Sequence, residues 1–429
     1  MPNQQIFCNV PWTNIHVYWD GSFGACCSEA SKPYSHGRYN LSELTVAEWF
    51  NTEPMQALRK HIMGNHPLSL CSGCYAEESI GHESRRIKEN FKSVIFTEQA
   101  FDESFLQSPM YENFITADTN IVPIDWHVDL GNECNLACKM CNPRASSRIA
   151  AQYRQWKITS QEENIFKNWT EDPHAWQNFV TSIQQTPNLN RIHFMGGEPF
   201  LNKKFNDILD VLLEYTPKVS VSFVTNGTFY DSNIVEKLKK FSSCDIEISI
   251  ESFDRTNDYI RQGSKIDVIK NNLEKFTANI SDTFKIILRS VPQLLSINSY
   301  HNYLRYCWEN KIIVQSIPLK NPKYLQISVL PKNIKQDLTV KYQQLEAELE
   351  QQSQKESKAL VTGRDANRIT AQILRETRAM IQLLQQDEDD QLRYELIKWL
   401  RQWDSVYSLD AMDFYPEYRD FLISYGYKD

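Results

Sequence analysis

Six short segments of the chain carry the pattern of buried β-strands, and helix-length segments separate them. In the first, residues 125–130 (DWHVDL), apolar side chains alternate with aspartate and histidine, and the other five are rich in branched apolar residues. These five lie at residues 191–199, 219–227, 245–252, 284–291 and 311–318. Strands that alternate with helices form parallel sheets, so the pattern predicts an α/β fold with a barrel-like sheet.

The segments on either side of these strands have different patterns. The front of the chain is rich in cysteine and includes a helix candidate from Ser42 to Ile62 with one apolar face. Beyond Pro331 apolar residues recur at helical spacing, and the aromatic end of the chain is expected to dock on the barrel or cover its opening. We therefore expect three domains, over residues 1–115, 120–330 and 331–429.

Composition and charge narrow the class of protein. At 429 residues and 50.2 kDa, with 41% hydrophobic residues, the chain can bury a large core. The net charge of −8 argues against a large nucleic-acid surface, and the basic stretch 84–88 (SRRIK) is predicted to be a solvated helix face. The first residues are neither basic nor apolar, and no segment is long enough to cross a bilayer. We expect a cytoplasmic protein with reduced thiols and no membrane association.

Three cysteines, Cys134, Cys138 and Cys141, lie within eight residues of one another just after the first predicted strand. Active sites of strand-helix barrels gather at that end of the strands. A four-iron cluster normally takes four thiolates, so a loop with three leaves one iron open to another ligand. The alternatives are a structural zinc loop or three unrelated buried cysteines, but zinc sites usually show cysteine pairs two apart and a fourth ligand nearby.

The C-x3-C-x2-C spacing, with Asn135 and Leu136 after the first cysteine, resembles the cluster motif of the radical S-adenosylmethionine (SAM) enzymes. The resemblance implies that the amino and carboxylate groups of SAM bind the open iron of a [4Fe-4S] cluster. It also implies that an electron from the cluster cleaves SAM to a 5′-deoxyadenosyl radical, which abstracts hydrogen from the substrate. The same resemblance narrows the fold to a partial, six-strand (β/α) barrel.

A second motif supports this resemblance. The sequence GGEP at residues 196–199 ends the second predicted strand, and it matches the motif that contacts the amino group of SAM in this family. Glu251 stands where relatives often have aspartate, and no role is predicted for it. Met140 is implied to lie against the adenine, where many relatives carry an aromatic residue. The resemblance implies these cofactor-binding residues: Met140, Gly196, Gly197, Glu198 and Ser249.

Four more cysteines form a separate pattern at the front of the chain: Cys8, Cys26, Cys71 and Cys74. The turn at residues 19–22 (WDGS) predicts a hairpin that brings the first two together, while Cys27 is expected to be a packing or spare residue. The arrangement resembles the twitch module, a shortened SPASM module, placed before the barrel instead of after it. It implies an auxiliary [4Fe-4S] cluster with all four thiolates as ligands, and a structural zinc site is the alternative.

Polar side chains expected inside the barrel are candidates for acting on the substrate. Strand alternation places these residues there: Asp129, His193, Thr225, Arg289 and Gln315. Asp129, His193 and Arg289 are the predicted catalytic residues, one of which would deprotonate a substrate radical. The alternative is that these polar groups satisfy one another's hydrogen bonds.

Together these motifs predict a radical SAM enzyme with an auxiliary cluster that relays electrons. Relatives with auxiliary clusters often modify ribosomally made peptides, so oxidation or cross-linking of a peptide is the first hypothesis. The rivals are two-electron oxidation of a small molecule such as a sugar or aminocyclitol, and a non-enzymatic iron-sulfur or zinc redox protein. We expect an electron donor such as flavodoxin or ferredoxin, and nucleic acid is an unlikely partner given the acidic charge.

Overall fold

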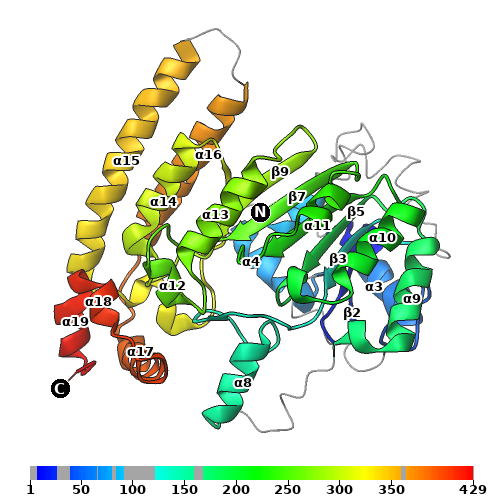
Figure 1. Cartoon of the computed structure of the whole chain (residues 1–429), viewed down its shortest axis with the longest axis horizontal. Helices are drawn as coiled ribbons and strands as arrows, with labels where there is room; N and C mark the ends of the chain where they lie inside the picture. The colour runs from blue at the N-terminus through cyan, green and yellow to red at the C-terminus, as the bar shows by residue number, and fades with distance from the viewer. Residues whose placement is uncertain are drawn as a thin grey trace. The chain divides into compact units, whose positions relative to one another are not determined.

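The structure is a computed structural model, which describes residues 7–26, 39–64, 66–79, 84–90, 121–158, 168–358 and 364–428. It shows an α/β fold with a mostly parallel eight-strand sheet in the order β10-β9-β7-β6-β5-β3-β1-β2 (Figure 1). The strands are β1 (Asn14–Val17), β2 (Phe23–Gly24), β3 (Asp125–Asp129), β5 (Arg191–Met195), β6 (Ser220–Thr225), β7 (Ser243–Ser249), β9 (Phe284–Ser290) and β10 (Ile313–Ser316). A two-stranded pair is separate: β4 (Ala137–Cys138) with β8 (Arg261–Gln262).

The described helices flank these strands along the chain. In the first half they are α1 (Val10–Thr13), α2 (Val46–Phe50), α3 (Glu53–Met63), α4 (Ser72–Ser79), α8 (Ser147–Gln155), α9 (Pro173–Gln184), α10 (Phe205–Tyr215) and α11 (Ser232–Leu238). In the second half they are α12 (Thr256–Ile260), α13 (Ile266–Thr277), α14 (Ile297–Glu309), α15 (Lys332–Lys358), α16 (Arg364–Leu384), α17 (Arg393–Tyr407), α18 (Ala411–Phe414) and α19 (Arg419–Ser424). No helix in these described ranges is long and apolar enough to span a membrane.

All six predicted strands are present, as β3, β5, β6, β7, β9 and β10. The predicted hairpin at the front of the chain is also confirmed, because β1 pairs antiparallel with β2 across a turn in which Gly21 has a φ of 81°. The sequence did not predict that β1 would also pair in parallel with β3, with His16 opposite His127. The cysteine-rich front region therefore adds two strands to the sheet.

The chain divides into two compact units, of which the first comprises Met1–Cys134, Pro143–Phe223 and Asp231–Cys244. Apolar and polar residues alternate along its strands, so one face of this part of the sheet is apolar. Trp126 and Phe194 on that face are fully buried, and they contact Phe179 of α9 and Phe205 of α10 at ring distances of 6.0 and 5.6 Å. Packing of these helices on the apolar face leaves the other face of the strands to polar side chains.

The helix predicted from Ser42 to Ile62 is wrong in one respect, because the structure has two helices there. Helix α2 begins at a capping box formed by Thr45 and Glu48, and it ends at Phe50 with Asn51 as its C-cap. Helix α3 then starts with Pro54 in its first turn, where the missing N–H of proline is tolerated. The predicted apolar face is nevertheless buried.

The second unit comprises Asn135–Asn142, Val224–Tyr230 and Asp245–Asp429. As predicted, its C-terminal part is helical: α15 and α16 pack together and both contact α14 (Figure 1). The aromatic end of the chain is packed within this unit, since Tyr415 and Tyr418 are 1% exposed and the Tyr418 hydroxyl donates to the Leu294 carbonyl at 3.2 Å. Cys27 lies outside the described residues.

Candidate active site and auxiliary cluster site

The three-cysteine loop begins five residues after β3. In the first unit, the Cys134 N–H donates to the Ser147 hydroxyl at 3.2 Å, and the Ser147 N–H donates to the Asn132 carbonyl at 2.7 Å. The start of helix α8 therefore fixes the backbone at Cys134, which is half-buried. This agrees with the prediction that the cysteines follow a strand at a turn.

The rest of the loop belongs to the second unit, where it is paired as a strand. Cys138 is buried in β4 and lies directly opposite Arg261 of β8, and the Cys141 N–H donates to the Cys138 carbonyl at 2.9 Å. Asn135 is fixed by the turn after β6, because it accepts a hydrogen bond from the Asn226 amide at 2.8 Å and donates one to the Thr228 hydroxyl at 2.9 Å. Local hydrogen bonds thus hold this loop at several points.

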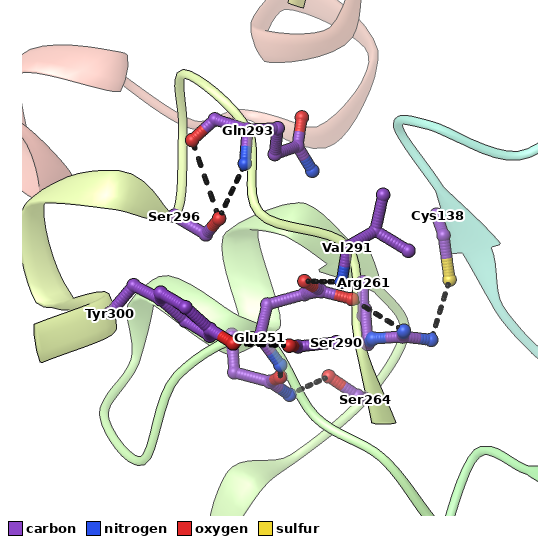
Figure 2. A network of polar contacts seen from close by, with 10 residues as sticks. Cys138, Glu251, Arg261, Ser264, Ser290, Val291, Gln293, Ser296 and Tyr300 are labelled. Carbon is purple, nitrogen blue, oxygen red and sulfur yellow. Dashed lines mark hydrogen bonds and ion pairs between the residues drawn. The ribbon is translucent and has the colours of Figure 1, made fainter. Parts of the chain in front are cut away.

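A buried ion pair lies against Cys138 (Figure 2). Arg261 donates to the Glu251 carboxylate at 2.6 Å and to the Cys138 sulfur at 3.8 Å. The second oxygen of Glu251 accepts the Val291 N–H at 2.9 Å. Burial raises the pKa of Glu251, and the neighbouring Arg261 acts against that rise. Glu251, which had no predicted role, therefore connects to a cluster cysteine through Arg261.

Lys139, between two of the cysteines, is also buried. Its ammonium group donates to the Tyr259 carbonyl at 2.5 Å and lies 3.7 Å from the centre of the Tyr259 ring. The hydroxyl of Tyr259 donates to Asp404 of α17 at 2.9 Å. Burial lowers the pKa of Lys139 to about 7, although Asp404 opposes that effect. Sequence reasoning missed this lysine, because an ammonium group in a loop is usually solvated.

The GGEP segment follows β5 in the first unit. Gly196 and Gly197 have positive φ values of 80° and 58°, and the Glu198 N–H donates to the Glu133 carbonyl at 2.7 Å. The Glu198 carboxylate is buried and accepts the Phe200 N–H at 3.3 Å. The motif therefore contacts the segment immediately before Cys134.

The four front cysteines interact with one another in the first unit. Cys8 is buried, which raises the pKa of its thiol, and Cys71, Cys26 and Cys74 lie close enough to raise it further. Burial likewise raises the pKa of Cys71, with Cys74 contributing. The thiols therefore influence one another electrostatically, and their role as ligands of one cluster stays a prediction.

Arg86 corrects the prediction of a solvated basic face at residues 84–88. It is 8% exposed, forms an ion pair with Glu78, and donates to the Phe7 carbonyl at 2.8 Å, next to Cys8. Its charge also acts to lower the pKa of Cys71. The basic stretch thus places a buried cation beside the front cysteines.

Within the described ranges, no three or more histidine, cysteine, aspartate or glutamate side chains are placed to hold a single metal ion. The donor sets nevertheless suit clusters, since thiolates are the usual ligands of a four-iron cube and they surround it instead of converging on one point; three of them leave one iron open and four leave none.

The polar face of the first unit carries two of the predicted catalytic residues. Parallel pairing aligns His16, His127 and His193 in one row across β1, β3 and β5, and His193 contacts the Ser222 hydroxyl at 2.8 Å. Burial lowers the pKa of His127 well below its ordinary value, with Arg85 and His193 contributing. This histidine is therefore neutral near pH 7.

Asp129 lies on the same face, two residues after His127 along β3. Its carboxylate is 3.2 Å from the Nε2 of His16 and is 17% exposed. Sequence reasoning missed His16, because only the pairing of β1 with β3 brings it to Asp129.

The remaining predicted residues belong to the second unit. Arg289 is ion-paired with Glu247 at 2.5 Å, so its charge is already compensated. Ser249 is buried near the end of β7, two positions after Glu247, and Met140 is half-buried. Gln315 is exposed on β10, opposite Arg289.

Comparison with known families identifies both cysteine patterns. Residues 128–288, which contain the three-cysteine loop and GGEP, match the radical SAM superfamily. This segment of the chain is therefore similar to the radical SAM superfamily. Residues 8–75, which contain the four front cysteines, match the SPASM iron-sulfur cluster-binding domain. The two matches indicate a [4Fe-4S] cluster that binds SAM and an auxiliary iron-sulfur cluster, and the SPASM match precedes the radical SAM match along the chain, as predicted.

The curated relatives that this chain matches have names that describe different chemistry. The chain is 30% identical over 186 residues to the radical SAM cyclopropyl synthase TigE of Paramaledivibacter caminithermalis, covering 40% of this chain and 36% of TigE. It is 26% identical over 178 residues to the sporulation killing factor maturation protein SkfB of Bacillus subtilis, covering 41% and 37%. It is 24% identical over 243 residues to the GTP 3′,8-cyclase of Helicobacter pylori, covering 55% and 69%.

Among solved structures, Streptococcus suis SuiB bound to precursor peptide SuiA is 15% identical with a TM-score of 0.34, over 63% of this chain and 57% of SuiB. The chain spans little more than a third of the length of TigE and SkfB.

Proposed function

We propose that this protein reductively cleaves SAM and abstracts hydrogen from a substrate, and that the substrate is a peptide. The observation that carries the proposal is the Cys134, Cys138 and Cys141 loop inside the radical SAM match, followed by GGEP against the residue before Cys134. Three thiolates leave one iron of the cluster open, which is what SAM binding needs.

Each predicted cofactor-binding residue has a place in this proposal. The three cysteines hold the cluster, the GGEP backbone receives the amino group of SAM, and Met140 and Ser249 contact the rest of the cofactor. A thioether packs well on an aromatic ring, which suits Met140 to the adenine. When bound, the cluster and SAM supply the 5′-deoxyadenosyl radical; the protein contributes binding, orientation and exclusion of water.

The front cysteines are proposed to hold the auxiliary cluster as a closed, four-iron site of the twitch type. Four thiolates would leave no iron open, so this cluster would accept or relay an electron instead of binding the substrate. The buried Arg86 beside these cysteines offsets part of the negative charge that four thiolates and a cluster bring into the interior.

Asp129 is the best placed of the predicted catalytic residues to accept a proton. It is partly accessible, it lies five residues before Cys134, and its carboxylate is 3.2 Å from the Nε2 of His16. Arg289 is less suited because Glu247 already compensates its charge. His193 is bonded to the Ser222 hydroxyl.

A peptide substrate is favoured by the SPASM domain together with the maturation role in the name of SkfB. A second candidate, a nucleotide or another small molecule, is favoured by the GTP 3′,8-cyclase match, which covers more of both chains than the other two. The acidic net charge gives no general attraction for a nucleotide, so the peptide is proposed first.

Iron content and SAM cleavage test the reaction class. Anaerobically reconstituted protein should hold about eight iron atoms per chain and form 5′-deoxyadenosine from SAM under reducing conditions. Changing Cys134, Cys138 and Cys141 to Ala should leave about four iron atoms and abolish cleavage. Cys244→Ala is the matched control, because this buried cysteine belongs to neither pattern. Wild-type protein that binds zinc at either site, or that never cleaves SAM, would refute the corresponding assignment.

Deuterium transfer tests the substrate. A deuterated precursor peptide encoded near the gene should transfer deuterium to 5′-deoxyadenosine, whereas GTP should not. Asp129→Asn should keep this transfer and lose the finished product, because hydrogen abstraction precedes the loss of a proton. Conversion of GTP with no peptide modified would replace the peptide by the second candidate.

A further inference from the structure

The guanidinium of Arg261 is presented to a cysteine of the three-cysteine loop by the backbone itself. Strands β4 and β8 place Cys138 and Arg261 directly opposite each other, where side chains are within contact distance. The neighbouring Lys139 N–H donates to the Ile260 carbonyl at 2.9 Å, which fixes the pairing. The Nη1 of Arg261 donates to the Cys138 sulfur at 3.8 Å (Figure 2).

Glu251 fixes this guanidinium from the other side. One carboxylate oxygen accepts from Arg261 at 2.6 Å, and the other accepts the Val291 N–H at 2.9 Å. The backbone N–H of Glu251 donates to the buried Asn257 side chain at 3.0 Å. Glu251 is fully buried and Arg261 is 8% exposed, so water screens neither charge well.

A buried ion pair is a poor way to gain stability, because desolvation offsets most of its attraction. Its contact with a cluster ligand suggests another use. Reduction adds negative charge to an iron-sulfur cluster and its thiolates, so a hydrogen bond or a cation at a sulfur stabilises the reduced form. Net charge and hydrogen bonds to the sulfurs are the means by which proteins set cluster potentials.

We propose that Arg261 raises the reduction potential of the cluster held by Cys134, Cys138 and Cys141, and that Glu251 positions the guanidinium and limits this rise. The inference rests on the proposed function only in that these cysteines hold a cluster. It applies whatever the substrate is.

The proposal predicts that two substitutions shift the reduction potential of this cluster in opposite directions. Arg261→Gln removes the cation and its hydrogen bond to sulfur, so the potential should fall. Glu251→Gln keeps the shape of the side chain but leaves the guanidinium uncompensated, so the potential should rise. A pair that only held the loop together would give no shift, or shifts of the same sign, because both changes would loosen the same contact.

A redox titration followed by EPR tests this on the full-length protein with both clusters. The signal of the three-cysteine cluster is recognised by its change when SAM is added. Arg261→Gln should make reduction roughly tenfold less favourable, about 59 mV for one electron, and Glu251→Gln should shift the potential the other way. Arg261→Lys keeps the positive charge on a shorter side chain, so its reduction potential should lie between those of Arg261→Gln and the wild type.

Arg393→Gln is the matched control. Arg393 is also buried and ion-paired, with Glu388, but its hydrogen-bonding partners are Val329, Tyr425 and Glu388, none of which belongs to the loop. Its change should leave the potential unaltered.

Equal potentials in the wild type, Arg261→Gln and Glu251→Gln, or shifts of one sign, would overturn the proposal. If Arg261→Gln loses its iron, the opposite shifts of Glu251→Gln and Arg261→Lys decide it. Because the titration needs no substrate, a failure to find 5′-deoxyadenosine would count against the proposed function and leave this result standing.

Discussion

Two glycines determine how closely the segment after β5 approaches the residues before Cys134. An added Cβ at Gly197 would lie 2.3 Å from the Glu133 carbonyl oxygen, and one at Gly196 would lie 2.7 Å from the Gly131 carbonyl oxygen. Real Cβ atoms do not approach backbone oxygens so closely. Both glycines also have a positive φ, a backbone angle that residues with a Cβ atom rarely adopt.

Gly197→Ala should therefore push GGEP away from the cluster loop. We expect at least a tenfold loss of SAM affinity, measured by the SAM-induced change in the EPR signal, together with a lower Tm. Gly426→Ala is the control, since Gly426 has the same sign of φ at 80° but no atom within 4 Å of the added Cβ. It should cost about 1 kcal/mol of stability and leave SAM binding intact. Normal SAM affinity in Gly197→Ala would show that this contact does not shape the site.

The sequence did not predict where the two buried arginines, Arg261 and Arg86, would lie. The cysteines and GGEP were found from spacing alone, because their chemistry requires residues close together in sequence. Arg261 is 123 residues from the cysteine it contacts, and a single sequence holds no signal for that distance. Arg86 was assigned to solvent because it stands in a basic stretch, and only its ion pair with Glu78 shows why it is buried.

At the scale of elements, prediction succeeded where burial imposes a pattern. The six strands of the parallel sheet were found because strands packed by helices are apolar on at least one face. The division between α2 and α3 was missed although Pro54 is visible in the sequence, because the apolar spacing continues across it. The pairing of β1 with β3 joins residues more than a hundred positions apart, which no local pattern predicts.

Packing between α14 and α15 predicts an acid sensitivity. His301 of α14 packs against Tyr342 of α15, with ring centres 5.7 Å apart. Burial lowers the pKa of His301 to about 4, and Lys341 and Arg305 add to the effect. Because the unfolded chain binds this proton at pH values below about 6.5 while the folded chain does not, stability falls as the pH drops from about 6.5 to 4.

His301→Gln should remove that contribution. After allowance for partial exposure it is on the order of 1 kcal/mol, so the wild type should lose a few degrees more of Tm between pH 7 and pH 5 than the variant does. His174→Gln in the exposed part of α9 is the control for the substitution itself, because that side chain lies outside the contact between α14 and α15. Identical losses in His301→Gln and the wild type would contradict the assignment.

On the scale of the whole molecule, the auxiliary domain shares its core with the first strands of the barrel. The first unit joins the front residues to β3, β5 and β6, and its strand β1 lies between β2 and β3 in the sheet. Ile15, Val17 and Phe23 of the front strands are 0–1% exposed. The first compact unit extends across the domain boundary that we predicted between residues 115 and 120. That boundary therefore stays a prediction.

Removing residues 1–120 should consequently destroy the fold, whereas removing only the auxiliary cluster should not. The deletion exposes the edge of β3 and the apolar surface beneath it. The loss of the buried Ile15, Val17 and Phe23 alone removes roughly 5 kcal/mol of stabilisation from hydrophobic burial. We expect aggregated protein on size-exclusion chromatography. Changing Cys71 and Cys74 to Ala leaves those strands intact, so that variant should stay monodisperse with about four iron atoms fewer and should still cleave SAM. A deletion variant that folded with a Tm near that of the full chain would show that the barrel does not depend on the front strands.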